Sequence, residues 1–230
     1  MKKKIIDLNN SYWQKKYSAP NVEGFVFRFY NKLLKHHIKN KKIKILDFGC
    51  GEGANLDYFY KQLNFEPYGV DISNISIKVC KRKFKKIKNN FKLINFKPEY
   101  PPKLFFKNQK YDIITAIQSL YYLDNHNLEL ALKNIEYNLN EGGFVFFTMV
   151  SRKSYFWSKL SNKKTLSNGM TKVDLGNKNI NYFNFIKNKS DLIKKFKLFK
   201  KLNVGFYDYS LIDINESTFH YTFFGKKIKK

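Results

Sequence analysis

The sequence is short of several residue types, and each shortage narrows what the chain can be. It has two cysteines in 230 residues, Cys50 and Cys80, too few for a disulfide framework and in no metal-ligand or redox spacing, so no metal site is expected. No apolar run approaches the roughly 18–20 residues of a membrane span. The basic first residues are followed by no apolar segment, so we expect no secretory signal and a cytoplasmic protein.

Acidic residues are also few: 18 stand against 44 basic residues, for a formal net charge of +26. Such a balance is typical of proteins that bind nucleic acid or a membrane surface. However, only Arg28, Arg82 and Arg152 are arginines, and alanine is rare, while Lys, Asn, Ile, Phe and Tyr are abundant. This pattern favours the coding bias of an AT-rich genome, because a nucleic-acid surface would tend to use arginine forks. An anionic substrate would still be attracted.

The middle of the chain alternates short apolar runs with segments of helical periodicity, and no Pro- or Gly-rich linker or internal repeat divides it. The length fits one α/β domain, and the 43 % of hydrophobic residues suffices for a sizeable core. Alternation of this kind predicts a parallel, doubly wound sheet with right-handed crossovers. The expected strands are 43–48, 66–73, 90–96, 111–118 and 144–150, and the expected helices are 54–63, 74–87 and 127–140.

The two flanks of this region have a different texture. Residues 11–40 carry aromatic and apolar side chains at helical spacing, whereas 151–189 is irregular, polar and aromatic. A helix is expected at 190–199. The strand-like runs 200–210 and 217–225 follow each other directly, so we expect them as an antiparallel pair added to the edge of the sheet.

Glycine is scarce, yet three of the eleven stand in "DFGCGEG", directly behind the first expected strand. Gly49, Gly51 and Gly53 would allow a tight turn and a close approach of backbone to a ligand. Free N–H groups at the following helix start can hold a carboxylate or phosphate. Asp71 ends the second expected strand about 20 residues further on, where an acidic side chain can bind two ribose hydroxyls. Together these features predict a site for a nucleoside with a charged tail.

The glycine spacing separates two classes of nucleoside site. A dinucleotide site favours G-x-G-x-x-G, whereas here the spacing is G-x-G-x-G behind Asp47. That pattern resembles the first motif of the class I S-adenosylmethionine-dependent methyltransferases. "YGVDIS", "YDIITAIQSLYYL", "LNEGGFVFFT" (with Glu141 in place of the usual proline) and "STFHYTFFGKK" are similar to later segments of that family, in order, over residues 10–225. The resemblance implies a Rossmann-like, doubly wound, mostly parallel sheet with an antiparallel last strand.

The resemblance also implies roles for individual residues, with S-adenosyl-L-methionine as the cofactor. Asp47 and the three glycines would shape the pocket for its methionine part. Asp71 would hold the ribose hydroxyls, and Ile72 would pack on the adenine. Asn95 and Phe96 fall where the family places a residue near the adenine amine. An aspartate is common there, so Asn95 is a departure.

Further members of the expected cofactor site come from the fourth strand and the N-terminus. Gln118 would face the methionine end, with a purely structural amide as the alternative. Trp13 and Tyr17 are candidates for an aromatic lid over the cofactor, although plain packing explains them equally well. We therefore expect an N-terminal helical lid at 1–40 and a methyltransferase domain at 41–230.

Methyl transfer from a sulfonium mainly requires alignment, and a hydroxyl acceptor usually needs a general base as well. His126, after the fourth strand, and His220, in the last strand, are the candidate bases, with surface or packing roles as the alternative. The stretch 151–189 lies where the family often builds a substrate cap. Its aromatic residues could wall a small organic substrate, or could simply be buried.

These residues lead to a first hypothesis and two alternatives for function. The first is methyl transfer to a hydroxyl or amine of a small molecule, which could be anionic, with a sugar or nucleotide-sugar as a refinement. "QSLY" at 118–121 differs from the Asn-Pro-Pro-aromatic tetrad of many enzymes that methylate base amines, which argues against nucleic acid. The alternatives are an RNA or protein methyltransferase using the basic surface, and a non-catalytic cofactor-binding protein of the same fold. The oligomeric state is not predicted.

Overall fold

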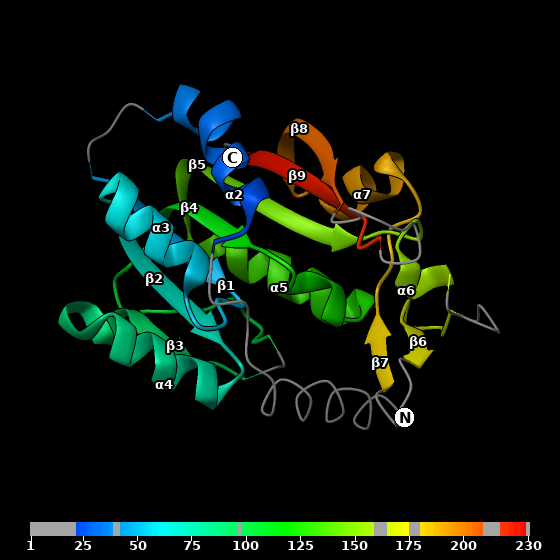
Figure 1. Cartoon of the computed structure of the whole chain (residues 1–230), viewed down its shortest axis with the longest axis horizontal. Coiled ribbons are helices and arrows are strands. Elements are labelled where there is room, and N and C mark those ends of the chain that lie inside the picture. Colours follow the sequence, from blue (N-terminus) through cyan, green and yellow to red (C-terminus); the bar gives the residue numbers. More distant parts are fainter. Residues whose placement is uncertain are drawn as a thin grey trace.

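This computed structural model describes residues 22–38, 42–95, 98–158, 165–174, 180–208 and 217–228. Their main feature is a seven-stranded sheet. The strand order is β3-β2-β1-β4-β5-β9-β8 (Figure 1). The parallel strands are β1 (Lys44–Phe48), β2 (Glu66–Asp71), β3 (Phe91–Leu93), β4 (Tyr111–Ala116) and β5 (Leu139–Val150).

The last strand runs against its neighbours. β9 (His220–Lys227) lies between β5 and β8 (Phe199–Tyr207) and is antiparallel to both. β8 is therefore parallel to β5, and the C-terminal ends of β4, β5 and β8 meet the start of β9 at one edge of the sheet. The predicted fold, a mostly parallel doubly wound sheet with an antiparallel last strand, is confirmed.

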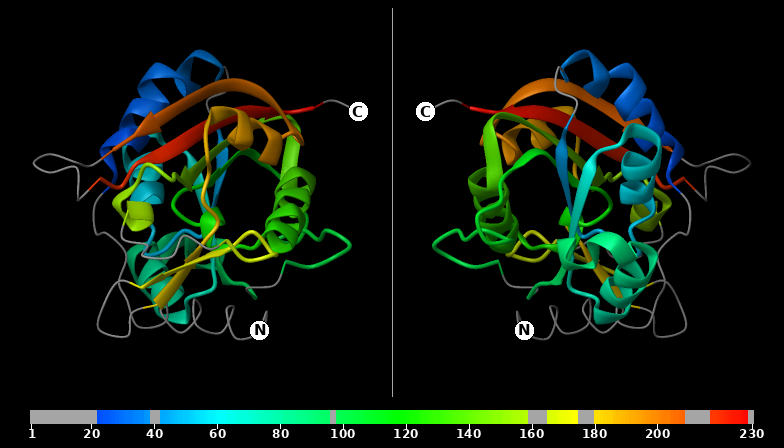
Figure 2. Two further views of the ribbon diagram at one scale, coloured as in Figure 1. Left: turned by 90° about the vertical axis from the view of Figure 1, so that its right-hand side faces the viewer. Right: turned by 90° about the vertical axis from the view of Figure 1, so that its left-hand side faces the viewer.

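Adjacent residues of the central strands point to opposite faces, which gives the sheet two separate cores. Ile45 packs in one buried cluster and Leu46 in the other, and Phe146 and Phe147 divide in the same way. Each face is covered by its own helices (Figure 2). One face carries α2 (Gly24–Lys32), α3 (Ala54–Leu63) and α4 (Asn74–Lys83), and the other carries α5 (Asn125–Asn138) and α7 (Lys189–Lys195).

Side-chain hydrogen bonds cap the N-termini of α4 and α5. The hydroxyl of Ser73 accepts a hydrogen bond from the N–H of Ser76 (3.2 Å) at the start of α4. The carboxylate of Asp124 accepts one from the N–H of Asn127 (2.8 Å) at the start of α5. Because α4 begins directly after β2, its first turn lies at the carboxyl edge of the sheet.

Several element boundaries differ from those expected. The helix predicted at 74–87 ends at Lys83 and is followed by a 3₁₀ helix, Lys85–Asn90, so the third strand is left with three residues. The fifth strand begins at Leu139 rather than at 144. Gly142 lies inside it with φ +72°, where the pairing with β4 shifts register. Gly142 and Gly143, which follow the helix expected at 127–140, therefore form an irregularity within β5.

The stretch 151–189, expected to be irregular, contains regular structure. It holds a short helix, α6 (Tyr155–Ser158), and a separate two-stranded antiparallel sheet of β6 (Thr171–Asp174) and β7 (Ile180–Phe183). Strands of four residues span only two alternations of buried and exposed positions, too few to give a periodic signal. Helix α7 ends at Lys195, short of the expected 199.

The described part of the N-terminal segment, from residue 22 onwards, contributes side chains to the core. Val26 and Phe29 of α2, and Leu34 of the 3₁₀ turn Leu34–His36, belong to the buried cluster that contains Ile45 of β1. Residues 11–21 lie outside the described part. In the described ranges, no helix is long and apolar enough to cross a membrane.

Candidate functional site

The glycine loop, residues 49–53, turns the chain from β1 into α3. All three of its glycines have positive φ, at +82°, +51° and +76° for Gly49, Gly51 and Gly53. A Cβ on Gly49 would lie 2.4 Å from the Cβ of Ser119, and one on Gly53 would lie 2.8 Å from the ring of Phe84. Both the backbone conformation and the close packing therefore require glycine.

Asp71, at the end of β2, binds the glycine loop. Its Oδ2 accepts a hydrogen bond from the N–H of Gly51 (2.8 Å), and its Oδ1 accepts one from the N–H of Ser73 (2.7 Å). Burial raises the pKa of this carboxyl, and the backbone hydrogen bonds oppose that shift. The backbone N–H of Ile72 also stabilises the charged form of this carboxylate. A carboxylate has about four acceptor sites, so three backbone donors leave acceptor capacity on Asp71.

Asp47 lies one residue before the end of β1 and is only 1 % exposed. Its Oδ1 accepts a hydrogen bond from the Thr115 hydroxyl (2.7 Å), on the neighbouring strand β4. Burial raises the pKa of Asp47 to about 7, the Thr115 hydrogen bond opposes the shift, and repulsion from Asp71 adds to it. Two carboxylates thus meet beside the glycine loop, and a cation there would favour their charged forms.

A second group of side chains gathers at the same edge, around the end of β8. Gln118, two residues beyond β4, has φ +52°, and its N–H donates to the hydroxyl of Thr148 (2.7 Å). Its side-chain amide donates to the hydroxyl of Tyr207 (3.1 Å). The ring of Tyr207 stacks on His220 (4.9 Å between centroids, 3° between planes) and on Phe25 of α2 (3.8 Å, 6°).

His220 is 3 % exposed and opens β9. Its Nδ1 contacts the carbonyl oxygen of Thr218, and because a carbonyl only accepts, Nδ1 carries the proton. Nε2 then holds a lone pair, and this buried atom has no hydrogen-bond partner among the described residues. Burial lowers the pKa of His220 to about 4, so the imidazole is neutral near pH 7. The arrangement is a buried proton acceptor.

The other expected site residues are more dispersed. His126 is exposed in the first turn of α5, outside the group around Tyr207. Ile72 is half-buried directly after Asp71. Trp13, Tyr17 and Phe96 lie outside the described residues.

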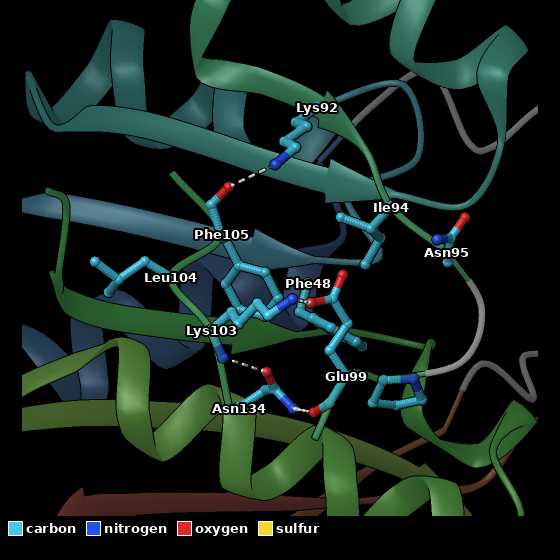
Figure 3. A pocket seen from close by; sticks show the side chains of 10 residues that line it. Phe48, Lys92, Ile94, Asn95, Glu99, Lys103, Leu104, Phe105 and Asn134 are labelled. Atoms are coloured by element: carbon cyan, nitrogen blue, oxygen red, sulfur yellow. Dashed lines mark hydrogen bonds and ion pairs between the residues drawn. The ribbon is translucent and has the colours of Figure 1, made fainter. Parts of the chain in front are cut away.

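Asn95 follows β3 and lines a cavity of about 200 Å³ between the sheet and α5 (Figure 3). Phe48 and Ile94 contribute apolar surface to it. Asn134 of α5 fixes the facing segment, because its amide accepts from the N–H of Lys103 (3.2 Å) and donates to the carbonyl of Glu99 (2.8 Å). The lining includes neither Asp71 nor the glycine loop, so this cavity by itself does not outline the expected cofactor site.

Sequence reasoning missed Thr115, Ser119 and Tyr207. The hydroxyl of Ser119 donates to the carbonyl of Phe48 (2.7 Å) and so holds the β4 connection against the β1 connection. Thr115 and Ser119 could have been found from the sequence, because each is a hydroxyl residue at or just after the end of β4, the strand beside β1. Tyr207 gave no such signal, because its position depends on the pairing of β8 with β9.

Known proteins similar to this chain include methyltransferases. The sequence model of a family described as a methyltransferase domain matches residues 19–187. The PH0226 protein from Pyrococcus horikoshii OT3 has a similar structure, with a TM-score of 0.67, 18 % identity, and coverage of 95 % of this chain and 99 % of that chain. An S-adenosylmethionine-dependent methyltransferase from Methanosarcina mazei has a TM-score of 0.64 and 16 % identity, and the match covers 86 % of this chain and 98 % of that chain.

A third similar structure was solved with a cofactor product bound. N-methyltransferase NodS from Bradyrhizobium japonicum WM9, in complex with S-adenosyl-L-homocysteine, gives a TM-score of 0.62 at 11 % identity, covering 98 % of this chain and 100 % of that chain. No curated protein sequence matches this one. Because the family model spans well over half of the chain and the sheet has the expected strand order, the chain belongs to the class I S-adenosylmethionine-dependent methyltransferase family.

Proposed function

We propose that the glycine loop, Asp47 and Asp71 hold S-adenosylmethionine at the carboxyl edge of the sheet. When bound, this cofactor supplies a methyl group on a positively charged sulfur. The acceptor capacity left on Asp71 fits a ribose hydroxyl, and the loop offers close approach to backbone. Asp47, whose charged form is disfavoured by burial, would regain it beside the ammonium of an amino acid.

The remaining cofactor contacts are proposed from position. Ile72 follows Asp71 and would cover the adenine, and Asn95 lines a partly apolar cavity beyond β3. Gln118 would face the methyl end, because its backbone is held by Thr148 at the edge. Trp13 and Tyr17 are retained as the proposed lid.

We propose a small molecule as the methyl acceptor, with a hydroxyl or amine as the acceptor group. The observation that supports this most is the buried, unpartnered Nε2 of His220 at the carboxyl edge. A hydroxyl of the acceptor would donate its hydrogen bond to Nε2 and lose its proton there as the methyl group arrives. Tyr207 stacks on the imidazole, and Gln118 binds the Tyr207 hydroxyl, so both position the base.

The stretch 151–189 would form the cap of this acceptor site. The proposed division of the chain stays a helical lid at 1–40 and a methyltransferase domain at 41–230. Support for the cap comes from ring contacts. Phe183 of β7 lies 5.7 Å from Tyr121, whose ring centroid in turn lies 5.4 Å from that of His220. Aromatic walls beside a buried proton acceptor suit a small organic molecule better than a polymer.

One observation favours a second candidate, an RNA or protein methyltransferase that uses the basic surface. Six of the eight residues from Lys81 to Lys88 are basic and exposed, on α4 and the 3₁₀ helix that follows. Of these, Lys83 approaches a carboxylate, at 3.9 Å from Asp57. This basic surface lies near β3, at one end of the strand order, whereas His220 lies toward the other end, at β8 and β9.

The deciding experiment supplies S-adenosylmethionine labelled in its methyl group, together with a metabolite extract, and identifies the labelled product by mass spectrometry. A small labelled product with wild-type protein, reduced about 100-fold or more by His220→Gln, is the expected result for a hydroxyl acceptor. His126→Gln is the matched control and should leave the yield unchanged. A parallel reaction with total RNA and protein, if it alone took up label, would favour the second candidate.

The cofactor half of the proposal is tested separately by calorimetry. Asp71→Asn removes a charged acceptor and should weaken S-adenosylhomocysteine binding by about 10-fold or more. Asp57→Asn, at a half-buried carboxylate of α3 that pairs with Lys61, is the control for loss of one carboxylate. Equal affinities of the two variants would show that Asp71 does not hold the ribose.

A further inference from the structure

We infer that Arg152 binds an anionic group, a carboxylate or a phosphate, of the methyl acceptor. This inference rests on the proposed function, because it names the class of molecule that the acceptor site takes. Arg152 stands two residues beyond β5, at the carboxyl edge of the sheet. Its backbone N–H donates to the carbonyl of Ile186 (3.0 Å), which joins the start of the proposed cap segment to its end.

The position of Arg152 relative to the candidate base follows from strand register. Val150, the last residue of β5, pairs directly with His220, and the N–H of Ser151 donates to the carbonyl of Phe219 (3.0 Å). Two residues of chain span at most about 7 Å. An acceptor that reaches the buried Nε2 of His220 would therefore place its far side near Arg152.

The guanidinium group is oriented but not neutralised. Its Cζ lies 4.3 Å from the ring centroid of Trp157, a stacking contact that fixes the plane of the fork. Its Nε is buried and has no hydrogen-bond partner in the described ranges. No ion pair to Arg152 occurs among those residues either. An oriented fork with unused donors matches a carboxylate or phosphate.

The surroundings add positive charge. Lys153 is exposed, with its Nζ 5.2 Å from the ring centroid of Phe219. The carboxylate of Asp208, which acts on His220, accepts from the hydroxyl of Ser217 (2.7 Å). Arg28 and Arg82, the other arginines of this lysine-rich chain, are exposed on helices, whereas Arg152 is half-buried.

The anion is that of the acceptor rather than the carboxylate of the cofactor. β4 lies between β1 and β5 in the sheet, so Arg152 is two strands away from the glycine loop. Two strand spacings amount to about 10 Å. Loss of the arginine should therefore leave cofactor affinity unchanged while weakening acceptor binding.

The test compares Arg152→Gln and Arg152→Lys with Arg82→Gln, which removes an exposed arginine of α4 from the same chain. Each variant is first titrated with S-adenosylhomocysteine, and all should bind it like the wild type. The loaded proteins are then titrated with phenyl phosphate and with benzoate. We expect one of the two to bind the wild type and Arg82→Gln, and to bind Arg152→Gln about 10- to 100-fold more weakly. Arg152→Lys should be intermediate, because it keeps the charge and loses the fork.

The identity of the tighter probe distinguishes a phosphate from a carboxylate. Binding of neither probe, or equal binding by Arg152→Gln and Arg82→Gln, would overturn the inference. In the labelled-extract reaction the wild-type product should be retained on an anion-exchange column. A neutral product would overturn the anion site while leaving the proposed function intact, whereas no labelled small molecule from the wild type would contradict the proposed function itself.

Discussion

Asp47 shows how a single buried carboxyl couples the site to stability. In the unfolded chain its pKa is 3.8, and burial raises the folded value to about 7. Between these two values the folded state binds a proton that the unfolded state has lost. The free energy of unfolding therefore falls as pH rises through this window, by a few kcal/mol at most (about 1.4 kcal/mol for each pKa unit).

Asp47→Asn should remove this pH dependence, because asparagine resembles the protonated acid. At pH 8 the variant should be more stable than the wild type by about 2–4 kcal/mol, and at pH 4 the difference should be close to zero. Urea unfolding at the two pH values measures both. A variant with the same relative stability at pH 4 and pH 8 would show that Asp47 is not a buried titrating group.

His220 gives a prediction for the rate of methyl transfer to a hydroxyl. A base with a pKa of about 4 stays neutral from pH 5 upwards, so kcat/KM should show no inflection near 6.5 that stems from this group. His220→Gln should lower kcat across the range, by about 10²- to 10⁴-fold. A loss of kcat in His126→Gln as large as that in His220→Gln would instead assign the base to the exposed histidine of α5.

At the residue scale, the sequence reached those site residues that lie in one local motif. Asp47 and the glycines lie within residues 47–53, and Asp71 follows at a spacing fixed by one helix, so a local sequence pattern is enough to find them. Tyr207 meets Gln118 from 89 positions away. That contact depends on the register shift in the β8–β9 pairing between Lys201 and Asn203. No sequence pattern predicts this shift.

At the scale of elements, α2 is integrated into the fold. The ring of Phe29 stacks on Phe146 of β5 (3.9 Å, 12°) and meets Phe224 of β9 edge-on (5.5 Å). Figure 1 shows the helix beside β8 and β9. A helix packed on the antiparallel end of the sheet adds to the core, so residues 22–34 belong with the sheet energetically, whatever the residues before them do.

Phe29→Ala should therefore destabilise the whole protein. Deleting a fully packed ring costs about 3–5 kcal/mol, whereas Phe27→Ala, two residues away and 53 % exposed, should cost about 1 kcal/mol or less. Chemical denaturation followed by tryptophan fluorescence and circular dichroism compares them. A small effect of Phe29→Ala on the global transition would mean that α2 unfolds separately, as a detachable lid would.

Elements with strong local preference were predicted well, and those set by tertiary contacts were not. The run "YDIITA" is β-branched and buried on both faces, which makes a central parallel strand. The four-residue strands β6 and β7 have no such signal and exist because they pair with each other. The start of β5 at Leu139 is likewise set outside the strand, since Lys227 of β9 donates to the carbonyl of Leu139 (2.9 Å).

At the scale of the whole molecule, the charge is unevenly placed relative to the two proposed ligand sites. Exposed cations cluster from Lys81 to Lys88, next to β3 at one end of the sheet, while His220 and Arg152 lie toward the other end. A polymer gripped by the cluster would have to cross the cofactor site to reach the buried proton acceptor. An anionic small molecule needs only Arg152 and feels the remaining charge as a long-range attraction.

The charge cluster and the acceptor site can therefore be separated by mutation. Lys81, Lys85 and Lys88 are exposed and no ion pair forms with them in the described ranges, so changing all three to glutamine should leave the fold intact. Turnover of a small acceptor should change less than about two-fold at physiological salt, where charges beyond about 8 Å are screened. Binding to RNA should weaken and lose up to about three units of its log–log salt slope. If the triple variant lost methyl transfer in parallel with RNA binding, the basic surface would be the substrate site, and the distance between the cluster and His220 would have to be bridged by the substrate itself.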